Sequence, residues 1–188
     1  MEFLKIIWGI SACILALTLS QMPVLAQEAP EYQIKAAMLY KFALFVEWPA
    51  GAFSGPASPF AVCVLGRDPF GPWLQHEMGK TLVGKHPIEI RYLEKAEDAG
   101  GCQMVFISRS ERPRLKKVLA SLQNTHALLI SDISPANEFC LAGGMIGLII
   151  ENNKVRFELN ATLAGKKGFK IDSTLERVAT SVKCGEEP

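Results

Sequence analysis

The sequence predicts an α/β fold, with a mostly parallel sheet covered by helices on both faces and a C-terminal antiparallel β-hairpin. Short aliphatic runs alternate with segments of helical spacing, which is typical of βαβ units. The runs are almost wholly apolar, as expected of strands buried on both faces, and they span residues 60–66, 104–108 and 127–131. Two further strand-like runs, 144–150 and 154–160, are separated by the polar turn 151–153, which indicates the hairpin.

The first residues predict an exported protein. Residues 3–19 are almost wholly apolar with Lys5 near their start, and Val24-Leu25-Ala26 fits a signal-peptidase site. A signal peptide over residues 1–26 would leave a mature chain of residues 27–188, which is a normal length for a single domain. Two alternatives stay open: the apolar segment is retained as a membrane anchor, or Cys13 marks a lipoprotein signal.

Charge and glycine content exclude two classes of partner. The formal net charge is +1 at pH 7, so neither nucleic acid nor an anionic membrane surface is expected as a partner. The glycine-rich segment 143–147 precedes a strand, whereas a dinucleotide loop follows a strand and opens a helix. We therefore interpret these glycines as a turn or bulge at the entry of a strand, and no cofactor is expected.

The segment 31–46 predicts the first helix of the mature chain. Apolar residues recur at spacings of four, four and three, and we expect this stripe to face the sheet: Ile34, Met38, Phe42 and Phe45. Trp48-Pro49 ends the helix, because a residue before proline avoids the helical region. Tyr40 and Leu44 widen the apolar surface. The helix thus covers a sheet face, or it also contacts a partner or a second copy of the chain.

Cap residues predict where the later helices begin. Asp68 is expected to cap a helix with Pro69 in its first turn and Gly79 at its end. Ser110 and Asn160 are expected to cap two more, and a last helix is expected to begin near Asp172-Ser173. Its residues expected to face inward are Leu175, Val178 and Val182. The strand 88–93 alternates apolar and charged residues, which places it near a sheet edge.

Charged and polar residues follow the predicted strands at the sheet end where open α/β folds bind ligands. They form a candidate ligand site that could hold a carboxylate or phosphate through its arginines: Arg67, Asp68, Arg109, Ser131 and Asp132. A structural interpretation is favoured over this ligand site. Asp68 would then act only as a helix cap, and Arg109 with Asp132 would form an ordinary ion pair at the end of the sheet.

Four cysteines follow the predicted signal peptide, and in an exported chain this even count indicates disulfides. Cys63 lies in the first buried strand and Cys102 just ahead of the next one, and these strands are neighbours in the commonest doubly wound order. A bridge between them would stabilise the fold by about 4 kcal/mol through chain entropy. Cys140 and Cys184 either pair with each other or stay free.

No local sequence motif indicates a metal site or the nucleophile of a hydrolase. The three histidines, His76, His86 and His126, lie far apart and show no helical pairing, so a metal site would have to be assembled from distant segments. No nucleophile motif such as G-x-S-x-G is present, and no histidine adjoins a candidate serine. A secreted hydrolase is therefore the weakest of the functions considered.

Five stretches in this order resemble the YfiR family of periplasmic proteins, over residues 32–182. They are "YQIKAAMLYKFALFVEWP", "FAVCVLGRDPFG", "GCQMVFISRSE", "LLISDI" and "GGMIGLIIENNKVRFELN". The resemblance implies a periplasmic, non-enzymatic repressor that binds the periplasmic sensing domain of an inner-membrane diguanylate cyclase. It also implies that an OmpA-like outer-membrane lipoprotein sequesters the repressor, so that cyclic di-GMP rises and biofilm forms. Other members accompany membrane sensors such as histidine kinases.

Individual cysteines can be carried over from this resemblance. Cys63 and Cys102 match the family's bridged pair. A second bridge of some members joins cysteines near the "GGMIGL" strand, whereas here Cys140 stands alone and Gly147 occupies the position of a partner. We expect a homodimeric periplasmic regulator. The alternative is a periplasmic small-molecule sensor or solute-binding module that uses Arg67, Arg109 and Asp132.

Overall fold

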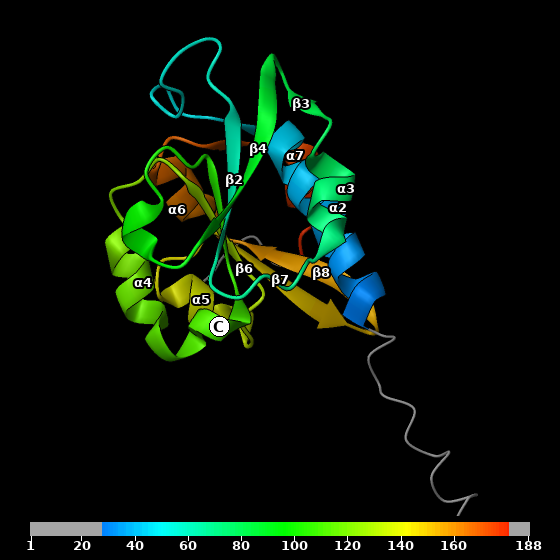
Figure 1. Ribbon diagram of the computed structural model, residues 1–188. Helices are drawn as coiled ribbons and strands as arrows, with labels where there is room; N and C mark the ends of the chain where they lie inside the picture. Colours follow the sequence, from blue (N-terminus) through cyan, green and yellow to red (C-terminus); the bar gives the residue numbers. More distant parts are fainter. Residues whose placement is uncertain (1–27, 181–188) are drawn as a thin grey trace, which may run out of the picture. The chain divides into compact units, whose positions relative to one another are not determined.

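The structure is a computed structural model that describes residues 28–180. The predicted signal peptide, Cys13, Val182 and Cys184 lie outside the described residues. Figure 1 shows how the helices and strands are arranged. The strands are β1 (Val46–Glu47), β2 (Phe60–Leu65), β3 (Leu82–Val83), β4 (His86–Leu93), β5 (Met104–Ile107), β6 (Leu128–Ser131), β7 (Ile146–Glu151), β8 (Lys154–Leu159) and β9 (Lys170–Ile171). The helices are α2 (Glu28–Phe45), α3 (Pro72–Met78), α4 (Leu115–Leu122), α5 (Ala136–Leu141), α6 (Ala161–Lys166) and α7 (Ser173–Val178), with the short 3-10 helices η3 (Ala96–Asp98) and η4 (Arg109–Arg114).

The strands form a seven-stranded sheet in the order β3-β4-β2-β5-β6-β7-β8, and β1 pairs with β9 in a separate small sheet. Strands β4, β2, β5, β6 and β7 run parallel, while β3 and β8 add antiparallel pairing at the two edges. The predicted mixed α/β class with a mostly parallel sheet is therefore confirmed. β2 and β5 are neighbours, as the doubly wound order requires.

The turn between β7 and β8 contains two residues rather than the three predicted. Glu151 pairs with Lys154, so Glu151 belongs to its strand. Asn152 and Asn153 have φ angles of 50° and 58°. Positive φ at both central residues matches the right-handed twist of the flanking strands, and asparagine tolerates this conformation better than most residues do.

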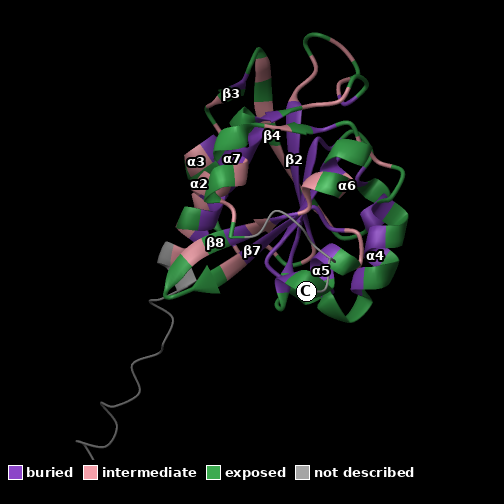
Figure 2. Ribbon diagram, turned by 180° about the vertical axis from the view of Figure 1, so that it is seen from behind, coloured by how far each residue is buried: buried purple, intermediate pink, exposed green. Residues whose placement is uncertain are grey.

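The central strands supply most of the core. Every residue of β2, β5 and β6 is buried, which confirms the prediction made from their aliphatic runs. Figure 1 shows α2, α3 and α7 on one side of these strands and α4, α5 and α6 on the other. In Figure 2 the strands at the centre are buried, whereas the helices show exposed residues on their outer surfaces.

Helix α2 buries a different face from the one predicted. Phe42 is buried, but Ile34 and Phe45 are 49% and 41% exposed. The buried face consists of Tyr32, Lys35, Ala36, Leu39, Phe42, Ala43 and Val46. Lys35 lies in the middle of this face, and a charged residue there breaks the apolar spacing on which the prediction depended.

Two predicted helix starts were wrong. Helix α3 begins at Pro72 after Gly71, and the Asp68 carboxylate instead accepts a hydrogen bond of 2.8 Å from the Phe70 amide in the preceding loop. Ser108, rather than Ser110, caps the η4 turn before α4. In both places the polar side chain bonds to a backbone amide two residues on, a local turn that a sequence does not distinguish from a helix cap.

The N-caps of the last two helices, α6 and α7, were predicted correctly. The Asn160 side chain accepts a bond from the Leu163 amide at 2.9 Å, and Asp172 accepts one from the Thr174 amide at 2.6 Å. Leu175 and Val178 were both expected to face inward. Leu175 is buried, but Val178 is 54% exposed, so the prediction for Val178 was wrong. Helix α7 spans only six residues, and Val178 is its last.

Candidate functional site

A cluster of charged residues joins the first turns of α2 to the carboxyl ends of β5 and β6. We call it the α2 anchor, and it consists of Glu31, Tyr32, Lys35, Arg109 and Asp132. The first three project from α2, Arg109 follows β5, and Asp132 follows β6. Because the carboxyl ends of neighbouring parallel strands meet at one edge of the sheet, this region gathers side chains from three separate segments.

The centre of the anchor is a buried ion pair. Lys35 Nζ lies 2.7 Å from Asp132 Oδ2, and both side chains are fully excluded from solvent. The ammonium group also donates to Glu31 Oε1, one helical turn earlier. A buried lysine that kept its charge without such partners would pay a large desolvation penalty, so these carboxylates make its burial possible.

Tyr32 adds a neutral donor to the same carboxylate. Its hydroxyl donates to Asp132 Oδ2 at 2.8 Å, and Lys35 Nζ lies 4.4 Å from the centre of its ring. Burial raises the pKa of the Tyr32 hydroxyl well above its ordinary value, and the negative charge of Asp132 raises it further. Tyr32 therefore stays protonated and keeps donating.

Arg109 closes the anchor on its solvent side. Its Nε lies 3.1 Å from the Asp132 carbonyl and 3.1 Å from Asp132 Oδ2, while its terminal nitrogen lies 3.0 Å from Glu31. Partial burial lowers the pKa of the Arg109 guanidinium, but the negative charges of Asp132 and Glu31 and the hydrogen bond to Glu31 favour its charged form, and the pKa is raised overall. The structural interpretation of the Arg109–Asp132 pair thus describes the geometry found.

One carboxylate oxygen of the α2 anchor is unsatisfied within residues 28–180. Asp132 Oδ1 is buried and has no hydrogen-bond partner among the described residues. Ser131 offers it nothing, because its hydroxyl donates to the Ile107 carbonyl at 2.7 Å and accepts from the Ile133 amide at 3.0 Å. Both roles of the Ser131 hydroxyl are structural, so this serine is not placed as a nucleophile.

The other two residues predicted for the ligand site lie apart from the anchor. The Arg67 amide donates to Ser110 Oγ at 2.9 Å, while Asp68 serves its local turn. Ser110 and Glu111 occupy the crevice between the ends of β2 and β5. A Cβ atom on Gly66 would come within 2.5 Å of Ser110 Oγ and 2.6 Å of Glu111 Oε1. Ser110 and Glu111 therefore pack closely against Gly66 at the end of β2.

Sequence reasoning found Arg109 and Asp132 but missed the three α2 residues. The apolar spacing of segment 31–46 predicts an ordinary amphipathic helix with another stripe facing the sheet. It therefore does not identify Tyr32 and Lys35 as site residues. The available signal was the pair Glu31 and Lys35, four residues apart, on a helix rich in apolar residues. Such a pair does not reveal that one of its members is buried.

The cysteines are placed by the structure as follows. Cys63 in β2 and Cys102 before β5 form a disulfide with a Cα–Cα distance of 6.0 Å across 39 residues of sequence. Cys140 in α5 is also disulfide-bonded, and Cys184 lies outside the described residues. The Cys63–Cys102 bridge joins two neighbouring strands inside the core, so it acts as a staple.

The glycine-rich segment serves close packing. A Cβ atom on Gly144 would fall 2.2 Å from the Phe139 ring, and one on Gly147 would fall 2.9 Å from Ala136 Cβ. Both contacts come from α5, which packs on β7. Gly143 and Gly144 precede β7, as predicted, whereas Gly147 lies within it. Gly144 and Gly147 allow the helix to approach the strand.

The outer surface of α2 is apolar. Ile34 and Phe45 lie along one exposed stripe of the helix, and Leu44 beside them is 47% exposed. Met38 borders this stripe and packs partly against the core. Lys41 lies within this stripe and is exposed. We call Ile34, Met38, Lys41, Leu44 and Phe45 the α2 outer face.

The described residues, 28–180, lack two further features. No cluster of histidine, cysteine and acidic side chains there could hold a metal ion. Within the same range, none of the helices combines the length and the hydrophobicity needed to span a bilayer.

The strand order β4-β2-β5-β6-β7 defines a doubly wound α/β protein. Its sequence matches the YfiR/HmsC-like family over residues 32–180, which is most of the chain, and the protein therefore belongs to that family. A conserved domain protein from Vibrio cholerae O1 biovar El Tor, known from a crystal structure, is similar over 65% of this chain with 10% sequence identity and a TM-score of 0.49. The chain spans 54% of that structure's length.

Proposed function

We propose that the protein is a periplasmic regulator that binds the periplasmic sensing domain of an inner-membrane signalling protein and holds it inactive. The YfiR/HmsC-like family fits a periplasmic regulator of cyclic di-GMP signalling. The partner we expect is a diguanylate cyclase, and a sensor histidine kinase is the second choice. The signal peptide would direct export and would be cleaved after Ala26.

The α2 outer face is the observation that carries this proposal. A helix that buries one face and exposes large apolar side chains on another has surface left to cover. Here Ile34, Leu44 and Phe45 are each more than 40% exposed. Lys41 in the same stripe favours a partner surface that is apolar with an acidic side chain at the matching position.

The α2 anchor supports this role by fixing the helix. Lys35 and Tyr32 are tied to Asp132, which holds the first turns of α2 on the sheet. A helix held in this way presents its outer face without a large cost in ordering on binding. Repression then follows because the regulator stabilises the inactive sensor state, by as much as it binds that state better than the active one.

Two more partners belong to the proposal. An OmpA-like outer-membrane lipoprotein sequesters the regulator, which frees the cyclase and raises cyclic di-GMP and biofilm formation. The regulator itself forms a homodimer through a face other than the α2 outer face, which is assigned to the sensor domain. No enzymatic activity is proposed.

Binding is tested with purified mature protein and the periplasmic domain of a cyclase or kinase encoded beside its gene. Calorimetry is expected to detect a complex, and Ile34→Glu to weaken it by at least about tenfold, as for a central apolar contact. Leu141→Glu is the matched control, since Leu141 is 67% exposed on α5. If Ile34→Glu dissociates a homodimer in sedimentation and leaves sensor binding unchanged, the assignment of this face is wrong.

A ligand sensor at the sheet end is the less favoured function. Arg109 would have to hold the ligand, but its guanidinium already contacts Glu31 and Asp132. Arg67 and Asp68, the other residues expected there, are not part of the α2 anchor: the Arg67 amide donates to Ser110 Oγ, and the Asp68 carboxylate accepts from the Phe70 amide. A melting shift with an organic acid or nucleotide that disappears in Arg109→Ala would favour the sensor function over the one proposed.

A further inference from the structure

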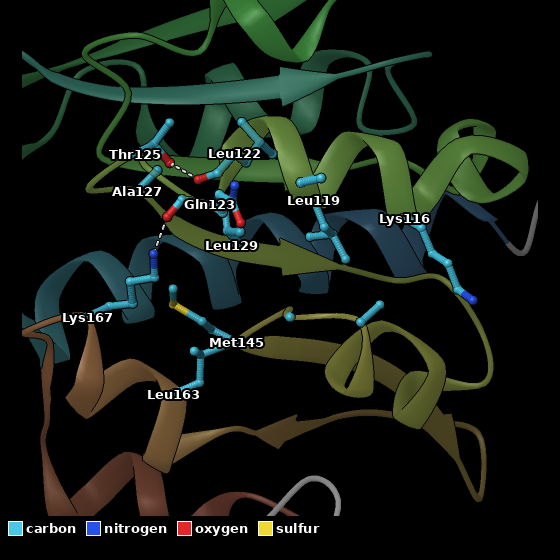
Figure 3. A pocket seen from close by; sticks show the side chains of 13 residues that line it. Lys116, Leu119, Leu122, Gln123, Thr125, Ala127, Leu129, Met145, Leu163 and Lys167 are labelled. Carbon is cyan, nitrogen blue, oxygen red and sulfur yellow. Dashed lines mark hydrogen bonds between the residues drawn. The ribbon is translucent and has the colours of Figure 1, made fainter.

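A second surface feature is independent of the α2 outer face. Between α4, β6 and α6 lies a pocket with a volume of about 390 Å³, which Figure 3 shows from close by. Helices α4 and α6 lie on the side of the sheet opposite to α2 in Figure 1. Pockets that bind small molecules are commonly of this size and mostly apolar.

The floor of the pocket is apolar and well packed. Leu119 and Leu122 come from α4, Leu129 from β6 and Met145 from the start of β7, and each of the four is buried in the fold. Leu163 of α6 forms the opposite wall and is half-buried. Figure 3 shows Leu119, Met145 and Leu163 around a common space.

The charged residues at the pocket have one sign. Lys116 and Lys167 are the only charged residues among those that line it, and Figure 3 shows them at opposite ends. Lys167 Nζ donates to the Gln123 carbonyl, which is a neutral partner. Within the described chain neither ammonium group is ion-paired. The pocket therefore combines an apolar interior with two cationic ends.

We propose that this pocket binds an amphiphilic carboxylate, with its hydrocarbon part on Leu119, Leu129 and Met145 and its carboxylate on Lys167. An apolar interior disfavours a small, fully hydrated anion such as free phosphate, and the two lysines disfavour a cation. A peptide would need polar partners from the floor, but the Thr125 hydroxyl already donates to the Leu122 carbonyl at 2.7 Å. The carboxylate replaces the Gln123 carbonyl as the acceptor for Lys167, which strengthens that bond because the acceptor is charged.

The test uses the full mature protein and decanoate, with decanol and decylamine as the uncharged and cationic probes. Calorimetry below the micelle-forming concentrations is expected to show decanoate bound at least about tenfold more tightly than decanol, as for one charge-assisted hydrogen bond. Lys167→Met should remove that preference. Lys166→Met is the matched control, because Lys166 is exposed on the same helix and does not line the pocket.

A second measurement places the ligand. In methyl-labelled protein the Met145 signal is expected to shift with decanoate, and Leu163→Trp, which fills the pocket, should abolish the shift. Equal binding of decanoate and decanol, or decanoate binding that Lys167→Met leaves unchanged, would overturn the proposal. So would the absence of any binding, or a shift that persists in Leu163→Trp.

Discussion

Lys35 Nζ and Asp132 Oδ2 lie 2.7 Å apart with both side chains fully excluded from solvent. The two residues are 97 positions apart in the sequence, and their contact attaches α2 to the end of β6. Removing one partner of a buried pair leaves an uncompensated charge. The contact thus has a consequence for stability that surface ion pairs of the same length lack.

Lys35→Met is therefore expected to lower the free energy of unfolding by about 3 kcal/mol, because it removes the fully buried cation of Asp132 and leaves that carboxylate with the half-exposed Arg109 guanidinium. Urea unfolding followed by circular dichroism measures this. The double variant Lys35→Met with Asp132→Asn should recover part of the loss, since no buried charge remains. Lys41→Met, an exposed change on the same helix, is the control and should cost little. A loss equal to that of Lys41→Met would contradict the buried pair.

The raised pKa of Tyr32 predicts that the protein becomes less stable at alkaline pH. Its pKa is raised by burial and by Asp132, so the folded state favours the protonated hydroxyl. The stabilisation is fully present below the tyrosine pKa of the unfolded chain, about 10, and is lost as pH rises toward the folded pKa. We expect the urea midpoint to fall as the pH rises above about 10, and Tyr32→Phe to reduce this fall. Tyr92, whose pKa burial and Asp68 also raise, is present in both proteins. An identical fall in the two proteins would exclude Tyr32 as its source.

The Cys63–Cys102 bridge should contribute measurably to stability. It closes a separation of 39 residues, for which the chain-entropy model gives about 4 kcal/mol. The double variant Cys63→Ala with Cys102→Ala is expected to lose roughly that amount in urea unfolding. A variant as stable as the parent protein would show that the staple has no role.

Peptide mapping under non-reducing conditions tests the cysteine pairs directly. We expect one linked pair of peptides containing Cys63 and Cys102. We also predict a second linked pair that contains Cys140, which is disulfide-bonded but not to Cys63 or Cys102. Cys184 is the expected partner in the mature protein, because Cys13 would leave with the predicted signal peptide. A free thiol at Cys63 would sink the first assignment, and alkylation of Cys184 in the unreduced protein would sink the second.

Gly147 is expected to tolerate no side chain. Its Cβ would fall 2.9 Å from Ala136 Cβ, so Gly147→Ala must push α5 away from β7 at a cost of about 1 to 3 kcal/mol. Ala136→Gly in the same protein should restore much of the loss. Gly165→Ala is the control, because nothing lies within 4 Å of its added Cβ. Equal melting temperatures for the two single variants would contradict the close approach of α5 and β7.

Much of the fold could be predicted because local patterns agree with it. The aliphatic runs of β2, β5 and β6 are buried on both faces, and Asn160 and Asp172 are caps that a sequence displays openly. Helix starts failed at Asp68 and Ser110, where a polar side chain serves a local turn or a neighbouring loop.

The site could be predicted only in part, for a physical reason. Arg109 and Asp132 each follow a strand, and the rule for sheet ends identifies both. Lys35 was missed because its burial depends on Asp132, which is distant in sequence, and apolar spacing assigns a lysine to the solvent side. The same error turned the α2 stripe around, so that Ile34 and Phe45, expected to face the sheet, are exposed.

The central claim is repression of a membrane sensor through the α2 outer face. It is tested most directly by the cyclase activity of the full-length membrane partner, measured in native membranes with and without the purified mature protein. We predict that the parent protein and Leu141→Glu lower cyclic di-GMP synthesis, whereas Ile34→Glu and Phe45→Glu lower it far less. Unchanged synthesis at saturating parent protein, or equal repression by all four proteins, would contradict the account.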